Sequence, residues 1–234
     1  MKRIIKISLI LLLVGMAVIV AVPFFKEKRA ERKYENEFKN IQESVTEKKS
    51  DVNGLVKKNK DCIGYVQIPG TTISYPVMQT KDKPDFYLNH DFDRNYGFYG
   101  TPYLSAYCDV KKSDNLIIYG HNINGGKMFG ALEKYKDKEF FNKHRKIYFT
   151  TDKKREYEVF AVMSVNIHKF EYWKFVMARD KKEHDEFVDK VEEHSLWRQG
   201  NKPKYGEQML MLSTCDNGKG DDWRIVLIAK CVYS

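Results

Sequence analysis

Three residues near the ends of predicted strands could together carry out acyl transfer. Cys215 follows an apolar run, Met209–Thr214, and Arg224 precedes the next run, Ile225–Ala229, after a loop rich in Asp and Gly. If the two runs pair as antiparallel neighbours, Cys215 and Arg224 lie at the same edge of the sheet. A guanidinium beside a thiol favours the thiolate, which is the nucleophilic form. The alternative for Arg224 is an ion pair with Asp221 or Asp222 at the surface.

A histidine completes this set. His121 follows a buried run, Asn115–Tyr119, and Gly120, so its side chain can face a cleft at the exit of a strand. With it, the chain has a nucleophile, an acid/base and an oxyanion donor, which acyl transfer requires. His121 could instead be a hydrogen-bonded core histidine, and Cys215 a small buried core residue. The place of Cys215 at a strand end favours the nucleophile.

The remaining motifs give no metal or cofactor site. Gly120–Lys127 differs from a phosphate-binding loop, because Gly126 intervenes before the lysine and Met128 replaces the hydroxyl residue. Asp91, Asp93 and Asn95 begin like a calcium loop, but Tyr96 stands where the loop needs glycine. We therefore expect no metal and no cofactor. The remaining candidates do not lie at a strand end beside a charged partner. Cys108 and Cys231 are therefore predicted to be structural, and His184 and His194 to lie at the surface of a helix.

Short β-type runs separated by turn residues follow from residue 63 onward, and they must position the reactive residues. Eight such strands predict a closed barrel or a sandwich. Two helices, Lys127–Tyr135 and Lys181–Trp197, interrupt them. The predicted strands are Ile63–Ile68, Thr72–Val77, Pro102–Ser105, Asn115–Tyr119, Lys146–Thr150, Glu156–Val165, Gln208–Thr214 and Arg224–Val232.

The composition is that of a folded protein with an anionic neighbour. The chain has 234 residues, of which 42% are hydrophobic, and a formal net charge of +9. Enough large apolar side chains are present to build a core, which excludes a wholly disordered chain. The positive charge suits nucleic acid, a lipid surface or an anionic cell wall. Because no nucleic-acid-binding motif accompanies the basic residues, we expect no nucleic-acid partner.

The N-terminus predicts a membrane anchor. Ile4–Val22 is nearly continuous apolar sequence, and nineteen helical residues span about 28 Å, close to a bilayer core of roughly 30 Å. A cleaved signal peptide is the alternative, but the sequence around Ala21 makes a poor cleavage site. We predict an n-region and signal anchor over 1–25, a helical stalk packing on the body over 26–60, and a catalytic body over 61–234. Lysines and arginines flank both sides of the span, so charge does not fix its orientation.

The reactive segments resemble a known family. Leu212-Ser-Thr-Cys215-Asp, an arginine at the start of the next strand, and the upstream Tyr119-Gly-His121-Asn-Ile resemble a sortase of class B. The resemblance covers about 60–234. It implies a mostly β fold with helices (α+β): an eight-stranded sortase-type β-barrel with an N-terminal helical stalk and a long helix between strands six and seven.

The resemblance also implies an activity. Sortases are membrane-anchored cysteine transpeptidases of Gram-positive bacteria that cleave a C-terminal sorting motif of a secreted protein through a thioacyl intermediate. They transfer the acyl group to an amine of cell-wall peptidoglycan or a pilin. Carried over by motif, Cys215 is the nucleophile, His121 the acid/base and Arg224 the oxyanion or substrate clamp. Such chemistry needs the body outside the cell, facing the wall, on a single-pass anchor. The candidate substrate-binding residues are Ser213, Thr214, Asn89 and Tyr119.

Two other functions stay open on the sequence. A hydrolytic cysteine peptidase would use the same residues and release an acid instead of an amide. A non-enzymatic, membrane-tethered wall-binding module would use the positive charge and leave Cys215 inert.

Overall fold

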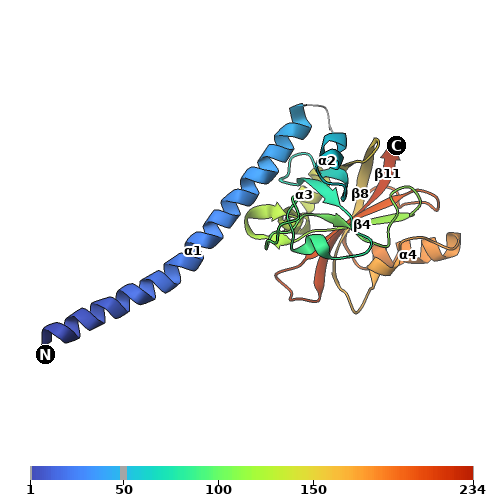
Figure 1. The fold of residues 1–234 in the computed structure, drawn as a ribbon. Helices are drawn as coiled ribbons and strands as arrows, with labels where there is room; N and C mark the ends of the chain where they lie inside the picture. The colour runs from blue at the N-terminus through green and yellow to red at the C-terminus, as the bar shows by residue number, and fades with distance from the viewer. Residues whose placement is uncertain (1, 48–51, 234) are drawn as a thin grey trace. The chain divides into compact units, whose positions relative to one another are not determined.

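The computed structural model describes residues 2–47 and 52–233 (Figure 1). The chain divides into two compact units, Met1–Asn40 and Ile41–Ser234. Helix α1 runs from Lys2 to Glu47 and contains Pro23, and a short helix α2 covers Val52–Lys58. Residues 26–47 and 52–58 of the predicted stalk are thus helical, residues 59 and 60 are not, and residues 48–51 lie outside the described residues.

The predicted membrane span lies within α1. In the described part of the chain, no helix is both long and apolar enough to cross a membrane. The side chains at positions 4, 5 and 7–10 of the predicted span lie outside the described side chains.

Eight strands of the second unit form a closed mixed barrel. Their order is β11-β10-β4-β3-β2-β1-β7-β8, and β11 pairs with β8 to close the ring. All eight predicted strands are confirmed, with bounds that differ by at most a few residues. The strands are β1 Cys62–Gln67, β2 Ser74–Met78, β3 Tyr103–Leu104, β4 Asn115–Tyr119, β7 Lys146–Thr150, β8 Lys154–Asn166, β10 Met209–Cys215 and β11 Trp223–Tyr233.

The pairings of β10 decide where the site forms. On one side β10 is antiparallel to β11, with Cys215 opposite Arg224. On its other side β10 is parallel to β4, with Ser213 opposite Tyr119. Because parallel strands end at the same edge of a sheet, the ends of β4 and β10 and the start of β11 meet at one rim. Met209–Thr214 are all buried, which explains their continuous apolar pattern.

The predicted helix Lys127–Tyr135 is wrong in its first half. Residues 122–128 form a small hairpin of β5 Asn122–Ile123 and β6 Lys127–Met128, around a 3₁₀ turn, η2 Asn124–Gly126. Met128, inside the predicted helix, has φ of +50°, a left-handed conformation that a right-handed helix does not contain. Gly125 and Gly126, which form the turn before it, have φ of +76° and +75°. A 3₁₀ helix, η3 Gly130–Lys136, follows, and then α3 Lys138–Lys143.

The second predicted helix ends earlier than expected. Helix α4 covers Lys181–Glu193 between β8 and β10, outside the barrel in Figure 1. Residues Ser195–Arg198 form strand β9 instead, which pairs with the part of β8 that extends beyond β7 and places Trp197 opposite Val162. Two short 3₁₀ helices, η1 Phe86–Leu88 and η4 Tyr172–Lys174, lie in the connections.

The prediction that His184 lies at the surface is wrong, since it is 1% exposed. It shares a face of α4 with Phe187, Val188 and Val191, at the i, i+3, i+4 and i+7 positions that a helix buries together. His194, at the end of the same helix, is partly exposed.

Candidate active site

Cys215, His121 and Arg224 line one open cavity of about 620 Å³ at the rim where β4, β10 and β11 meet. Each is half-buried, so each is both held by the fold and accessible from the cavity. The cavity takes further walls from the η1, β3 and η4 regions. The other lining residues are Pro84, Asp85, Leu88, Tyr103, Ser105, Ala106, Tyr107, Tyr119, Gly120, Ile167, Tyr172, Trp173, Ser213 and Thr214.

Gly120 lets the β4 strand turn into the site. A Cβ atom at this position would lie 2.8 Å from the ring of Phe129, which is too close for any side chain. The backbone of Gly120 is fixed on both sides, since its N–H donates to Ser213 O and its carbonyl accepts from Thr214 Oγ1. The residue before His121 is therefore tied to the strand that carries the thiol.

The ring of His121 is oriented by a backbone carbonyl. His121 Nε2 lies 2.8 Å from Leu88 O. A carbonyl oxygen only accepts, so Nε2 carries the proton of this hydrogen bond and Nδ1 is left to exchange a proton. Phe98 lies parallel to the imidazole, with ring centroids 6.1 Å apart. The fold therefore assigns different roles to the two ring nitrogens.

Asn122 joins the histidine segment to the nucleophile. Its Nδ2 donates to the carbonyl of Cys215 and to Glu133 Oε1, both at 2.8 Å. The residue directly after His121 thus holds the backbone of Cys215. This contact keeps the thiol and the imidazole at the same rim.

A buried carboxylate anchors the strand end behind the thiol. Asp216 is fully buried, with 0% exposure. Its Oδ1 accepts from Lys136 Nζ and its Oδ2 from Ser164 Oγ, each at 2.6 Å. Burial by itself raises the pKa of the Asp216 carboxyl, but the hydrogen bonds from Lys136 and Ser164 outweigh it, and the pKa lies below its ordinary value.

Arg224 is held by the loop that precedes it. Its Nη1 donates to Asp221 O at 2.5 Å and to Trp223 O at 2.9 Å, and both acceptors are backbone carbonyls. No ion pair between Arg224 and a carboxylate occurs among the residues that the structure describes. Backbone carbonyls thus position the guanidinium, and Arg224 pairs opposite Cys215. The remaining N–H groups of Arg224 can donate to a ligand in the cavity.

The floor of the cavity is built from neutral phenols. Tyr172 OH pairs with Ser213 Oγ at 2.7 Å, and Tyr103 OH donates to Asp85 Oδ1. Burial raises the pKa of Tyr172 to about 12 and raises those of Tyr103 and Tyr119 as well. These hydroxyls stay protonated at neutral pH, so no phenolate from them neutralises the positive charge of Arg224.

The predicted substrate residues separate into two groups. Ser213, Thr214 and Tyr119 line the cavity, although Ser213 and Thr214 are 1% and 3% exposed and bond to the fold. Asn89 is exposed and follows the lining residue Leu88, but it does not line the cavity itself.

The other thiols lie away from this rim. Cys62 and Cys108 are buried, and burial raises the pKa of Cys62 to about 12, which keeps it a thiol. Cys231 lies inside β11, on the segment that starts with Arg224 but at its far end. Among the described residues, no group of three or more His, Cys, Asp or Glu side chains gathers as metal ligands.

Sequence patterns gave no signal for several residues of this site. Leu88 contributes only a backbone oxygen to His121, and Lys136 reaches Asp216 from a 3₁₀ helix eighty residues away. Asn122 could have been found, because it follows the histidine directly. The aromatic residues Tyr172 and Trp173 lie in a connection with no periodic pattern.

This closed barrel, with a thiol, an imidazole and a guanidinium at one rim, defines a cysteine enzyme of acyl transfer. The sortase domain model matches residues 66–232, and the chain therefore belongs to the sortase family. Two relatives align with most of this chain. The chain is 28% identical to sortase B of Staphylococcus aureus over 99% of this chain and 98% of that protein. It is 31% identical to sortase B of Listeria monocytogenes over 80% of this chain and 76% of that protein.

The solved structures agree with this class. The Staphylococcus aureus sortase B–substrate complex superposes with a TM-score of 0.78 at 26% identity, over 89% of this chain and 99% of that one. The resemblance to class B seen in the sequence is thus confirmed, as is the eight-stranded barrel with helices. By family and class, the chain is a cysteine transpeptidase of the cell wall, with a sorting-motif protein as substrate and a peptidoglycan amine as acceptor.

Proposed function

We propose that this chain cleaves the C-terminal sorting motif of a secreted protein through a thioacyl intermediate on Cys215. The observation that carries the proposal is the single cavity lined by Cys215, His121 and Arg224. His121 takes the proton of the Cys215 thiol, and the resulting thiolate attacks the scissile carbonyl carbon. Arg224 donates to the carbonyl oxygen as that oxygen gains negative charge. His121 passes a proton to the amine that leaves, and the acyl group stays on sulfur as a thioester.

In the second half of the reaction, transfer of the acyl group to the acceptor, the proton movements are reversed. An acceptor amine of peptidoglycan attacks the thioester carbonyl while His121 takes up its proton. As the new amide forms, the Cys215 sulfur leaves as a thiolate, and His121 returns the proton to it. Asn122 and Asp216 hold the backbone around Cys215 through both halves, so the thiol returns to the same position. Tyr119, Leu88 and Trp173 form the walls against which the substrate peptide packs.

Product analysis tests the proposal. The full chain in nonionic detergent is incubated with a sorting-motif peptide library, with and without triglycine as acceptor. We expect a glycyl adduct when triglycine is present, and free acid only in its absence. If the yield of free acid is the same with and without triglycine, the chain is a hydrolytic peptidase. If no peptide is cleaved, a wall-binding module is favoured.

Two alanine variants locate the nucleophile. Cys215→Ala removes the proposed thioester and is expected to abolish both products while the melting temperature stays unchanged. Cys231→Ala is the matched control, because it removes a thiol from the far end of the neighbouring strand. Turnover of the Cys215→Ala variant above a few per cent of the Cys231→Ala rate contradicts the assignment.

We further propose that residues 4–22 anchor the chain in the cell membrane in a single pass, with the catalytic body outside and facing the wall. The apolar run of the sequence and the location of sorting substrates support this proposal. Fractionation of cells tests it: the full chain should sediment with membranes and its body should be cut by added protease. A variant that lacks residues 2–25 should stay in the soluble fraction, and sedimentation of that variant would overturn the proposal.

A further inference from the structure

A second cavity lies at the opposite end of the strands that carry the active site. Cys215 and Arg224 pair at one end of the β10–β11 hairpin, and Met209 pairs with Lys230 at the other. An open cavity of about 520 Å³ lies beside this far end. Its lining residues are Val110, Lys111, Asp152, Lys153, Arg155, Gly206, Glu207, Gln208, Cys231 and Val232.

Arg155 forms the charged base of this far cavity. The residue is 8% exposed, although it carries a full positive charge. Its Nη1 donates to Thr151 Oγ1 at 2.7 Å, while its Nη2 lies 3.6 Å from Asp152 Oδ1, beyond a normal hydrogen bond. A guanidinium has five N–H donors. The bond to Thr151 is the one hydrogen bond that Arg155 makes to a described side chain. A buried cation with unused donors is completed by an anion or by water.

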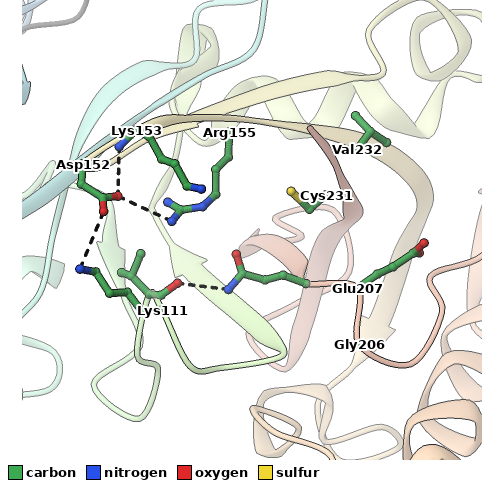
Figure 2. A pocket seen from close by; sticks show the side chains of 10 residues that line it. Lys111, Asp152, Lys153, Arg155, Gly206, Glu207, Cys231 and Val232 are labelled. Carbon is green, nitrogen blue, oxygen red and sulfur yellow. Dashed lines mark hydrogen bonds and ion pairs between the residues drawn. The ribbon is translucent and has the colours of Figure 1, made fainter. Parts of the chain in front are cut away.

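Lys153 extends the positive charge to the mouth of the cavity. Its side chain is exposed and forms no ion pair with the described residues. Figure 2 shows Lys153 and Arg155 beside each other, with the sulfur of Cys231 pointing toward them. Lys111 reaches the same cavity from the β3–β4 connection, where its Nζ lies 3.8 Å from Asp152 Oδ2.

The two carboxylates of the cavity are already engaged. Asp152 accepts from Thr151 Oγ1 and from the N–H of Lys153, and it faces Lys111 and Arg155 (Figure 2). Glu207 Oε2 accepts the backbone N–H of Lys204 at 2.9 Å. The lining therefore keeps an excess of one positive charge and unused donors on Arg155 and Lys153. Gln208 adds none, because its amide nitrogen donates to Val110 O and Ser113 O.

We propose that this cavity binds a phosphate group, presented either by a small phosphate ester or by a phosphodiester chain. Arg155 and Lys153 approach from the base and the mouth of the cavity, so a tetrahedral group can meet both with different oxygens. A planar carboxylate offers two oxygens on one side only. The cavity lies away from Cys215, so a bound phosphate leaves the active site open. The inference does not depend on the transpeptidase activity.

Calorimetric titration of the full chain in nonionic detergent tests the proposal. The probes are glycerol 3-phosphate as a monoester and glycerophosphoglycerol as a diester, each against sodium chloride at equal ionic strength. We expect saturable binding of at least one probe and none of chloride. Binding of the monoester identifies small phosphate esters as the source, and binding of the diester alone identifies a phosphodiester chain. Absence of binding by both probes overturns the proposal.

Three glutamine variants and the alkylation rate of Cys231 test whether phosphate binds in this cavity. Arg155→Gln should weaken binding at least tenfold, since it removes charged hydrogen bonds. The exposed Lys153→Gln should weaken it about threefold without any effect on folding. Lys182→Gln, on exposed α4, is the matched control and should leave the affinity unchanged. Bound phosphate should slow alkylation of Cys231 by iodoacetamide, measured by mass spectrometry, and leave Cys215 unaffected. Binding that survives both substitutions in the cavity shows that the proposal is wrong.

Discussion

Arg224 shows how the fold can fix a charged side chain without a charged partner. Two backbone carbonyls of the Asp221–Trp223 segment accept from Nη1, so the guanidinium plane is set by the loop itself. Among the described residues, Arg224 does not form the alternative ion pair with the carboxylate of Asp221 or Asp222, and Asp222 instead faces His168. Because the planar fork and not only the charge is positioned, geometry should matter for catalysis.

Arg224→Lys should therefore be nearly as damaging as Arg224→Ala. Lysine keeps the charge but cannot donate to two loop carbonyls and to the oxyanion in one plane. Losing one oxyanion donor costs about 2.7–4 kcal/mol, so we expect kcat to fall about 100- to 1,000-fold in both variants. Steady-state rates on a cleavable peptide measure this, with the melting temperature as control. A lysine variant that keeps more than about a third of the wild-type rate would show that charge alone suffices.

Asn122→Ala should lower kcat without a matching change in KM. The amide of Asn122 holds the carbonyl of Cys215, so its loss loosens the nucleophile and not the substrate walls. A hydrogen bond of about 1–2 kcal/mol corresponds to a 5- to 30-fold fall in kcat. Asn217→Ala is the matched control, since Asn217 is exposed and makes one long bond to the Asn122 carbonyl. Equal effects of the two substitutions would argue against a positioning role.

At the scale of elements, one ion pair and one hydrogen bond of Asp216 join three elements behind the thiol. Asp216 follows β10, Lys136 ends η3 and Ser164 lies in β8. Glu133, one turn earlier in η3, also pairs with Lys136 at 2.6 Å. The end of β10 is thus fixed by contacts to η3 and to β8, in addition to its pairing with β4 and β11.

Lys136→Met should destabilise the protein by about 2–3 kcal/mol, because it leaves the buried Asp216 carboxylate with one hydrogen-bond donor fewer. The double variant Lys136→Met, Asp216→Asn should recover part of this loss, since the charge is removed with its partner. Urea unfolding at pH 7 measures the free energies. No recovery in the double variant would mean that Lys136 acts through its packing and not through the charge of Asp216.

The same carboxylate gives a pH dependence with a defined sign. The pKa of Asp216 is lowered in the folded state, so its contribution is complete above the unfolded value near 3.9 and is lost as pH falls through the folded pKa. The wild type should therefore lose stability faster than Asp216→Asn below about pH 4. Urea midpoints between pH 6 and pH 3 check this, and parallel curves for the two proteins would contradict it.

At the scale of the whole molecule, stability depends on the closure of the barrel between β8 and β11. Ten residue pairs join these strands, from Trp223 opposite Asn166 to Tyr233 opposite Glu156. Leu227, opposite Val162 in this pairing, is fully buried. The closure brings β11 back onto the much earlier strand β8 and places Arg224 opposite Val165.

Leu227→Ala should lower the free energy of unfolding by about 2–5 kcal/mol, through lost burial and the cavity it leaves. Val232→Ala, on the same strand but 47% exposed, should change it by less than about 0.5 kcal/mol. Urea unfolding of both variants provides the comparison. A loss below 1 kcal/mol for Leu227→Ala would show that the closing pair contributes little.

The strands and the chemistry of one hairpin can be predicted from local sequence alone. Continuous apolar runs such as Ile117–Tyr119 and Met209–Leu212 can be read locally, because a buried strand needs apolar residues along its own length. The meeting of Cys215 with Arg224 is equally local, since a short loop joins two antiparallel strands. The helix over Lys127–Tyr135 failed because two glycines with positive φ turned its start into a hairpin.

Contacts between segments that lie far apart in the chain are set by how the barrel folds and cannot be predicted locally. The parallel pairing of β4 with β10 brings His121 to Cys215, and the carbonyl of Leu88 chooses which ring nitrogen can exchange a proton. The burial of His184 and the far cavity around Arg155 follow from packing of the same kind. Such contacts leave no periodic mark on the sequence, because each depends on which strand ends meet when the barrel closes.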